Sequence, residues 1–180
     1  MSFLKAFRLF ALCLSLSLLC SCTNAQQQQQ QQPTYPPYNP DAPELVDIQR
    51  TIDDAMDDIE DSIKLKGSFK PFAVVILAND SIAEIHATKE QKDSFNMQDL
   101  EEELSIEALK GNYKVVSIFY LAKSTNNLLE PDTKVVAIHA EHTEDDFAYH
   151  FEYPYSKPTP KSVVFMEPLA NFEEQVMFKP

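Results

Sequence analysis

The chain has 180 residues and a formal net charge of −13, from 28 Asp and Glu against 15 Lys and Arg. Such an acidic chain repels nucleic acid and attracts cationic proteins or peptides. Its three cysteines are Cys13, Cys20 and Cys22, and its two glycines are Gly67 and Gly111. A domain that begins after Cys22 therefore has no disulfide, thiolate metal site or cysteine nucleophile, and it lacks the glycine-rich loops that hold phosphates.

The first 21 residues follow the plan of a secretory signal peptide. Lys5 and Arg8 precede an apolar run over 9–19, and small residues come after it. The run is too short for a transmembrane helix, which needs about 20 apolar residues. Removing residues 1–21 takes away two positive charges and no acids, so the formal net charge changes from −13 to −15.

Residues 19–22, Leu-Cys-Ser-Cys, resemble the lipobox of bacterial lipoproteins, in which a Leu lies three residues before the modified cysteine and a small residue directly before it. The resemblance implies cleavage before Cys22 and acylation of that cysteine, with palmitate among its lipids. The protein would then be anchored in the cell envelope. In that family an Asp after the cysteine favours the inner membrane, so Thr23 favours the outer membrane. The alternative is cleavage after Ala25, which would release a secreted or periplasmic soluble protein.

Residues 22–42 are expected to form a lipidated cysteine and a disordered tether. Seven consecutive glutamines, Gln26–Gln32, precede four prolines within 33–40. No periodic apolar face is present that could offset the entropy lost on ordering. The globular domain is therefore expected over 43–180.

An amphipathic helix is predicted at the start of this domain. Asp41 is the expected N-cap, apolar residues recur every three or four positions from Leu45 to Ile63, and Gly67 is placed to end the helix. The rest of the helix is acidic, which indicates either a solvated face or a surface for a cationic partner. The carboxylates assigned to this surface are Asp47, Asp54, Asp57, Asp58 and Asp61.

The remaining pattern predicts a sheet and a second helix. Five strands are expected over 72–78, 81–87, 113–122, 134–142 and 147–153, and a helix over 96–110. The runs 162–166 and 172–178 are candidates for an additional edge strand. Pro154, Pro158 and Pro160 are expected to end the strand over 147–153. The order predicts one α+β domain whose largely antiparallel sheet has five to six strands. It resembles the order of profilin-like and roadblock-like modules, a likeness of topology that implies no function.

The clearest hairpin surrounds the turn 143–146. Pairing of Thr143 with Asp146 sets His139 opposite His150, with Cβ atoms about 4.5 to 5.5 Å apart. The same register gathers apolar side chains on one face, which we expect to be the core. The histidines are therefore expected on the opposite, solvated face.

Two opposed imidazoles suggest a zinc site, with Glu141 or Glu152 as a third ligand beside His139 and His150. The alternative is a cross-strand histidine pair without a metal, and no other cofactor is indicated. Glu141 and Glu152 lie roughly 14 Å apart along the strands, too far for a glycosidase pair. His142 is expected at the rim. Because no motif supplies a catalytic group, we expect a binding protein rather than an enzyme.

Overall fold

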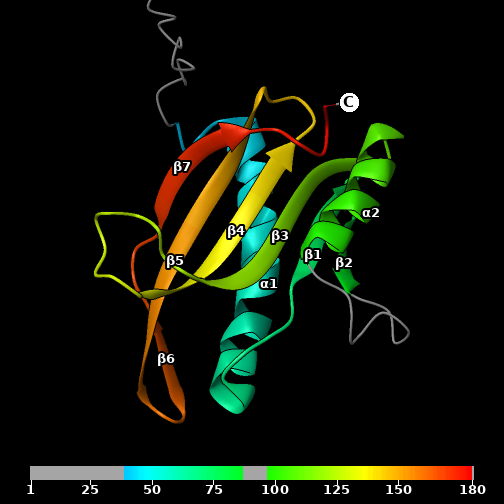
Figure 1. Ribbon diagram of the computed structural model, residues 1–180. Coiled ribbons are helices and arrows are strands. Elements are labelled where there is room, and N and C mark those ends of the chain that lie inside the picture. Colours follow the sequence, from blue (N-terminus) through cyan, green and yellow to red (C-terminus); the bar gives the residue numbers. More distant parts are fainter. Residues whose placement is uncertain (1–38, 87–96, 180) are drawn as a thin grey trace, which may run out of the picture. The chain divides into compact units, whose positions relative to one another are not determined.

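The computed structural model of the protein describes residues 39–86 and 97–179. The expected signal peptide, Cys22 and most of the tether lie outside these residues. The elements of the described part are α1 (Pro43–Lys66), β1 (Phe72–Leu77), β2 (Ile82–His86), α2 (Met97–Leu109), β3 (Tyr113–Lys123), β4 (Lys134–His142), β5 (Phe147–Thr159), β6 (Ser162–Phe165) and β7 (Leu169–Glu174). This order of helices and strands confirms the predicted α+β class (Figure 1).

The strands form one antiparallel sheet in the order β2-β1-β3-β4-β5-β6, and β7 pairs with β5 beside this path. The sheet has seven strands, against the predicted five to six. Both β6 and β7 return to pair with β5, because β5 is long enough to pair with them at different positions. Along 148–152, β5 therefore lies between β4 and β7, an interior position.

The two helices pack on opposite faces of the sheet (Figure 1). Val74 and Ile138 belong to the face under α1, and Val75 and Val116 to the face under α2, as the alternation of side chains along strands requires. Full burial of such a side chain stabilises the fold by about 1.5 to 3 kcal/mol. The apolar cluster under α2 includes no residue of β4 or β5. On this face of the sheet, α2 therefore does not cover those two strands.

The C-terminal boundary of α1 is the predicted one, whereas its N-cap residue differs from the prediction. Its buried residues are Leu45, Ile48, Thr51, Ile52, Ala55, Ile59 and Ile63. The N-cap is Ala42 and not Asp41, whose N–H bonds to the Asn39 side chain at 3.3 Å in the preceding turn. Gly67 ends the helix as predicted, with φ 77° and its N–H 3.0 Å from the carbonyl oxygen of Ile63.

β5 is longer than predicted, because it continues through Pro154 and Pro158. A proline lacks the N–H donor but keeps its carbonyl acceptor, and the carbonyl of Pro154 accepts the N–H of Met166 at 2.8 Å. The extension also carries Lys157 to the end of α1. Its amino group donates to the carbonyl of Ile63 at 2.9 Å and to the carbonyl of Lys64 at 3.3 Å, which places a cation at the helix C-terminus, where the helix dipole favours positive charge.

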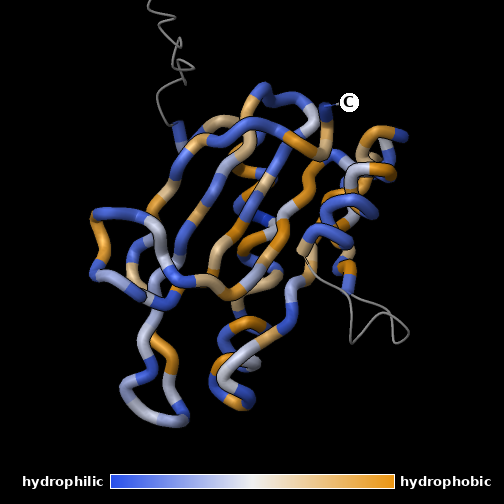
Figure 2. The backbone as a smooth tube through the Cα atoms, viewed as in Figure 1, coloured by the Kyte–Doolittle hydropathy of each residue, from blue (hydrophilic) through white to orange (hydrophobic). Residues whose placement is uncertain are grey.

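The predicted register of the β4–β5 hairpin is confirmed, with His139 opposite His150 and Ile138 opposite Phe151. The loop 124–133 joins β3 to β4 and is largely hydrophilic (Figure 2). The register decides which side chains share a face, and it places the histidines on the side of the sheet that carries α2.

Candidate functional site

The predicted site residues of the hairpin are buried or, at His150, half-buried, and the prediction of a solvated face is wrong. His139 and Glu141 of β4 are 8% and 0% exposed, and Glu152 of β5 is 4% exposed. His142, which was expected at the rim, is 1% exposed. Buried polar groups need hydrogen-bond partners, so other segments must supply them.

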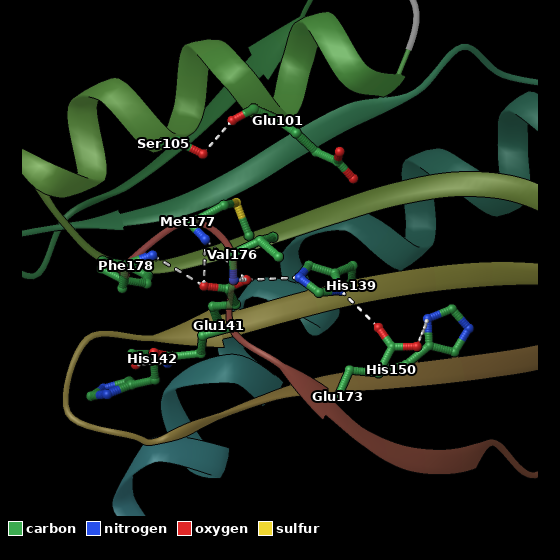
Figure 3. A network of polar contacts seen from close by, with 11 residues as sticks. Glu101, Ser105, His139, Glu141, His142, His150, Glu173, Val176, Met177 and Phe178 are labelled. Carbon is green, nitrogen blue, oxygen red and sulfur yellow. Dashed lines mark hydrogen bonds and ion pairs between the residues drawn. The ribbon is translucent and has the colours of Figure 1, made fainter. Parts of the chain in front are cut away.

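Glu141 obtains main-chain partners from the C-terminal segment 176–178 (Figure 3). Its Oε1 accepts the N–H of Val176 at 2.8 Å. Met177 donates to Oε1 at 3.2 Å and to Oε2 at 3.0 Å, and Phe178 donates to Oε2 at 3.2 Å. Successive main-chain N–H groups form a concave binding site for an anion. A buried carboxylate thus holds the C-terminal segment against the sheet.

His139 lies between two carboxylates. Its Nε2 is 2.9 Å from Glu141 Oε1, and its Nδ1 is 3.2 Å from Oε2 of Glu173 on β7. Burial alone would lower the pKa of this imidazole, but hydrogen bonds and charges from Glu141 and Glu173 outweigh burial and raise the pKa of His139 to about 9. The same hydrogen bond lowers the pKa of Glu173 in spite of its burial. At neutral pH His139 is therefore a cation that donates from both nitrogens.

The chain of acids and imidazoles continues toward the loop 124–133. Oε1 of Glu173 lies 3.7 Å from Nδ1 of His150, and Nε2 of His150 lies 3.8 Å from Oε1 of Glu152. Both distances are longer than a hydrogen bond. Oε2 of Glu152 accepts a short hydrogen bond from the hydroxyl of Ser124. Acidic and histidine side chains thus alternate from β4 to the loop.

A depression of about 570 Å³, called here the β5–β7 pocket, borders this chain of groups. Its lining residues are Thr125, Asn126, Asn127, Leu128, His150, Glu152, Asn171 and Glu173. Two of them are carboxylates, and neither Lys nor Arg is among them. The local field is negative. Burial raises the pKa of the Tyr120 phenol above its ordinary value of 10.0, and the charges of Glu173, Glu101 and Glu152 raise it further. The pocket therefore favours a cation.

The zinc hypothesis has little support from this arrangement. The residues that the structure describes contain no group of three or more His, Cys, Asp or Glu placed to hold a metal ion. His139 opposes His150 as predicted, but both nitrogens of His139 engage carboxylates. A protonated imidazole has no lone pair for a metal. The four residues of the hypothesis belong instead to the chain of acids and imidazoles. They are His139, His150, Glu141 and Glu152.

Four of the five carboxylates in the predicted acidic surface of α1 are exposed, and the fifth, Asp47, is mostly buried in ion pairs. The exposed members are Asp54, Asp57, Asp58 and Asp61. The Asp47 side chain is 13% exposed and forms ion pairs with Arg50 at 2.8 Å and with Lys114 at 2.7 Å. Burial opposes ionisation of Asp47, but hydrogen bonds from Lys114 and Arg50 lower its pKa. Asp47 thus joins α1 to β3 and does not belong to the open surface.

His142 lies beside this ion pair, at the end of β4. Its Nδ1 accepts the N–H of Glu144 at 3.0 Å, so the proton of a neutral ring is on Nε2. Within the described residues Nε2 has no hydrogen-bond partner, and Oδ2 of Asp47 is 3.6 Å away. This buried N–H therefore makes no hydrogen bond, and the negative charge of Asp47 beside it is its only favourable polar contact among the described residues.

Three parts of the site were not predicted: Glu173, Tyr120 and the N–H groups of 176–178. The alternating run that ends at Glu173 was a usable signal, because it indicates a strand whose acid lies on one face.

In the described part of the chain, neither helix has the length and hydropathy required to span a membrane. Comparison with protein-family models, with curated proteins and with solved structures finds no match to this chain.

Proposed function

We propose that the protein is a lipid-anchored binding module of the cell envelope, and that it holds a cationic protein or peptide in the β5–β7 pocket. The observation that carries this proposal is the lining of the pocket. Two carboxylates, one histidine and three asparagines line it, without a Lys or Arg. The net charge of −15 that remains after removal of residues 1–21 extends the attraction beyond the pocket and would steer a cationic partner toward it.

The carboxylates are prepared for a charged donor. Glu152 is already mostly desolvated, and the hydroxyl of Ser124 fixes its orientation, so binding need not order it again. Hydrogen bonds between ammonium or guanidinium groups and carboxylates are among the strongest in proteins. An anionic ligand would meet Glu152 and Glu173, and the lining contains no Lys or Arg to offset their charge. Charge thus favours a basic partner.

The same geometry favours binding over catalysis. A general acid or base at neutral pH needs a pKa near the operating pH and an accessible proton. With a pKa of about 9, His139 holds its proton at neutral pH, and both nitrogens are occupied by carboxylates. It acts as a fixed cation that orients Glu173 toward the pocket.

The envelope anchor is tested at Cys22. In a bacterial host grown with labelled palmitate, the wild-type protein is expected to carry the label, and Cys22→Ser is expected to lose it. The matched control is Cys20→Ser, which keeps the proposed acylated residue and should retain the label. Loss of labelling in the Cys20 variant alone would place the acyl chain on Cys20 instead of Cys22. No labelling of the wild type contradicts the anchor and favours the secreted form.

The pocket is tested by titrating the protein with a short oligolysine peptide at low ionic strength, where screening is weak. The variant Glu152→Gln should weaken binding about tenfold, because a charge-assisted hydrogen bond is lost. The amide oxygen of Gln can still accept the hydrogen bond from Ser124, so the pocket keeps its shape.

The matched control for this titration is Asp58→Asn on α1, which removes the same charge from an exposed position. It should leave the affinity within about twofold of the wild type, since surface charges contribute little. If Asp58→Asn weakens binding and Glu152→Gln does not, the cationic partner binds on the acidic surface of α1 instead. Absence of any binding contradicts the proposed function.

A further inference from the structure

Each carboxylate of the β5–β7 pocket has one oxygen that is committed and one that is not. Oε2 of Glu173 accepts from His139 at 3.2 Å, and Oε2 of Glu152 accepts from Ser124. The two Oε1 atoms face His150 at 3.7 and 3.8 Å and accept no hydrogen bond from the described residues. A carboxylate oxygen that is oriented and lacks a donor is an acceptor for a ligand.

The two Oε1 atoms lie on opposite sides of the His150 ring. Along β5, Glu152 follows His150 by two residues, whereas Glu173 of β7 pairs with Ala148, two residues before His150. Each Oε1 approaches a different ring nitrogen. The imidazole therefore separates the two acceptors, and a single ammonium group in contact with one of them is kept from the other.

Two cations at a suitable spacing can occupy both acceptors. In an extended peptide, side chains at alternate positions point to the same side and are about 6.8 Å apart, from a rise of about 3.4 Å per residue. Side chains of adjacent residues point to opposite sides, so only one of them can enter the pocket. The exposed amides of Asn127 and Asn171 lie in the same lining, where they can bond to a peptide main chain.

We propose that the ligand of the β5–β7 pocket is an extended peptide segment with basic residues at alternate positions. One cationic group binds Oε1 of Glu152, the other binds Oε1 of Glu173, and the intervening side chain points to solvent. This inference rests on the proposed function and specifies its ligand. His150 acts as the spacer that sets the distance between the two subsites.

The experiment compares blocked alanine peptides of equal length by titration followed by NMR, and the first two of them have equal charge. One contains Lys-Ala-Lys, a second Lys-Lys, and a third a single Lys. The alternating peptide is expected to bind about tenfold more tightly than the adjacent pair, because it makes one more charge-assisted contact. The adjacent pair should bind about as well as the single lysine.

The variant Glu152→Gln should remove the advantage of the alternating peptide, because only the subsite at Glu173 keeps its charge. Asp61→Asn on α1 is the matched control and should preserve the advantage, since Asp61 is exposed on the other side of the sheet. A melting curve of Glu152→Gln that coincides with that of the wild type separates loss of the subsite from loss of the fold.

The outcomes separate the two proposals. If the alternating and adjacent peptides bind equally and Glu152→Gln weakens both, the pocket binds cations but the two-subsite inference is wrong. A preference that survives in Glu152→Gln also overturns the inference. If no basic peptide binds, the proposed function and the inference both fail. If Glu152→Gln loses the preference and also melts at a lower temperature, Glu173→Gln is the second test, because the Glu173 side chain is 45% exposed and carries the other subsite. This variant should also lose the preference, and a preference that survives in it would overturn the inference.

Discussion

Replacing Glu141 with Gln is expected to lower the free energy of unfolding by about 3 kcal/mol, in the range for breaking one partner of a buried ion pair. Glu141 is 0% exposed and accepts the N–H groups of Val176, Met177 and Phe178 and the imidazole of His139. Gln has one acceptor oxygen in place of two. Its NH2 group would face donors, leaving buried N–H groups unsatisfied and the His139 cation less compensated.

Urea unfolding at neutral pH measures this effect, and hydrogen exchange locates it. The amide protons of Val176, Met177 and Phe178 should exchange faster in Glu141→Gln, while those of β1 should change only with global stability. The matched control is Glu144→Gln, an exposed residue of the same hairpin, which should change stability by less than about 0.5 kcal/mol. A loss below about 1 kcal/mol in Glu141→Gln would contradict the assigned role of its charge.

The stability of the protein is expected to fall as the pH rises from neutral to about 9, because of His139. The pKa of His139 in the folded protein, about 9, is above the ordinary value of 6.5. The folded state therefore binds a proton that the unfolded state releases. The stabilisation is complete below about pH 6.5 and is lost as the pH rises through about 9, and it amounts to about 3 kcal/mol.

Urea unfolding curves across this range measure the loss, and His139→Gln is the matched variant. Its side chain can still donate to one carboxylate, but it does not titrate. The variant should be less stable than the wild type at neutral pH, and the difference should shrink as the pH rises. Parallel profiles for the two proteins would mean that His139 does not gain a proton on folding.

The register of the hairpin could be predicted because it depends on local sequence. The turn 143–146 separates two runs with a period of two residues, and only one pairing puts their apolar side chains on one face. That pairing set His139 opposite His150, as observed. The helix stripes and the left-handed Gly67 follow from equally local rules, in which the residue type itself carries the information.

The environment of the histidines could not be predicted, because it depends on contacts between distant residues. Glu141 is buried by residues 35 to 37 positions later in the chain. Their contribution is a main-chain N–H, which nearly every residue type possesses, so the sequence of 176–178 does not indicate it. The role of Glu173 likewise depends on the register of β7 with β5, which no turn residue specifies.

The same limitation explains why Asp47 was grouped with the exposed acids of α1. Within the helix it has the spacing of a surface residue, and its short-range partner Arg50 is typical of an exposed ion pair. What removes it from the surface is Lys114, at the start of β3 and distant in the sequence. The pattern of one helix contains no information about which strand residue lies beside it.

The contact between Glu141 and the C-terminal segment has a consequence for natural variation in this protein. The two sides of the same hydrogen bond are under very different constraint. Any amino acid except proline supplies an N–H at position 176, and the Val176 side chain is 55% exposed, so this position can drift with little cost. At position 141 only a carboxylate serves both the N–H groups and His139. Selection should therefore conserve the residue type at position 141 and tolerate substitutions at position 176.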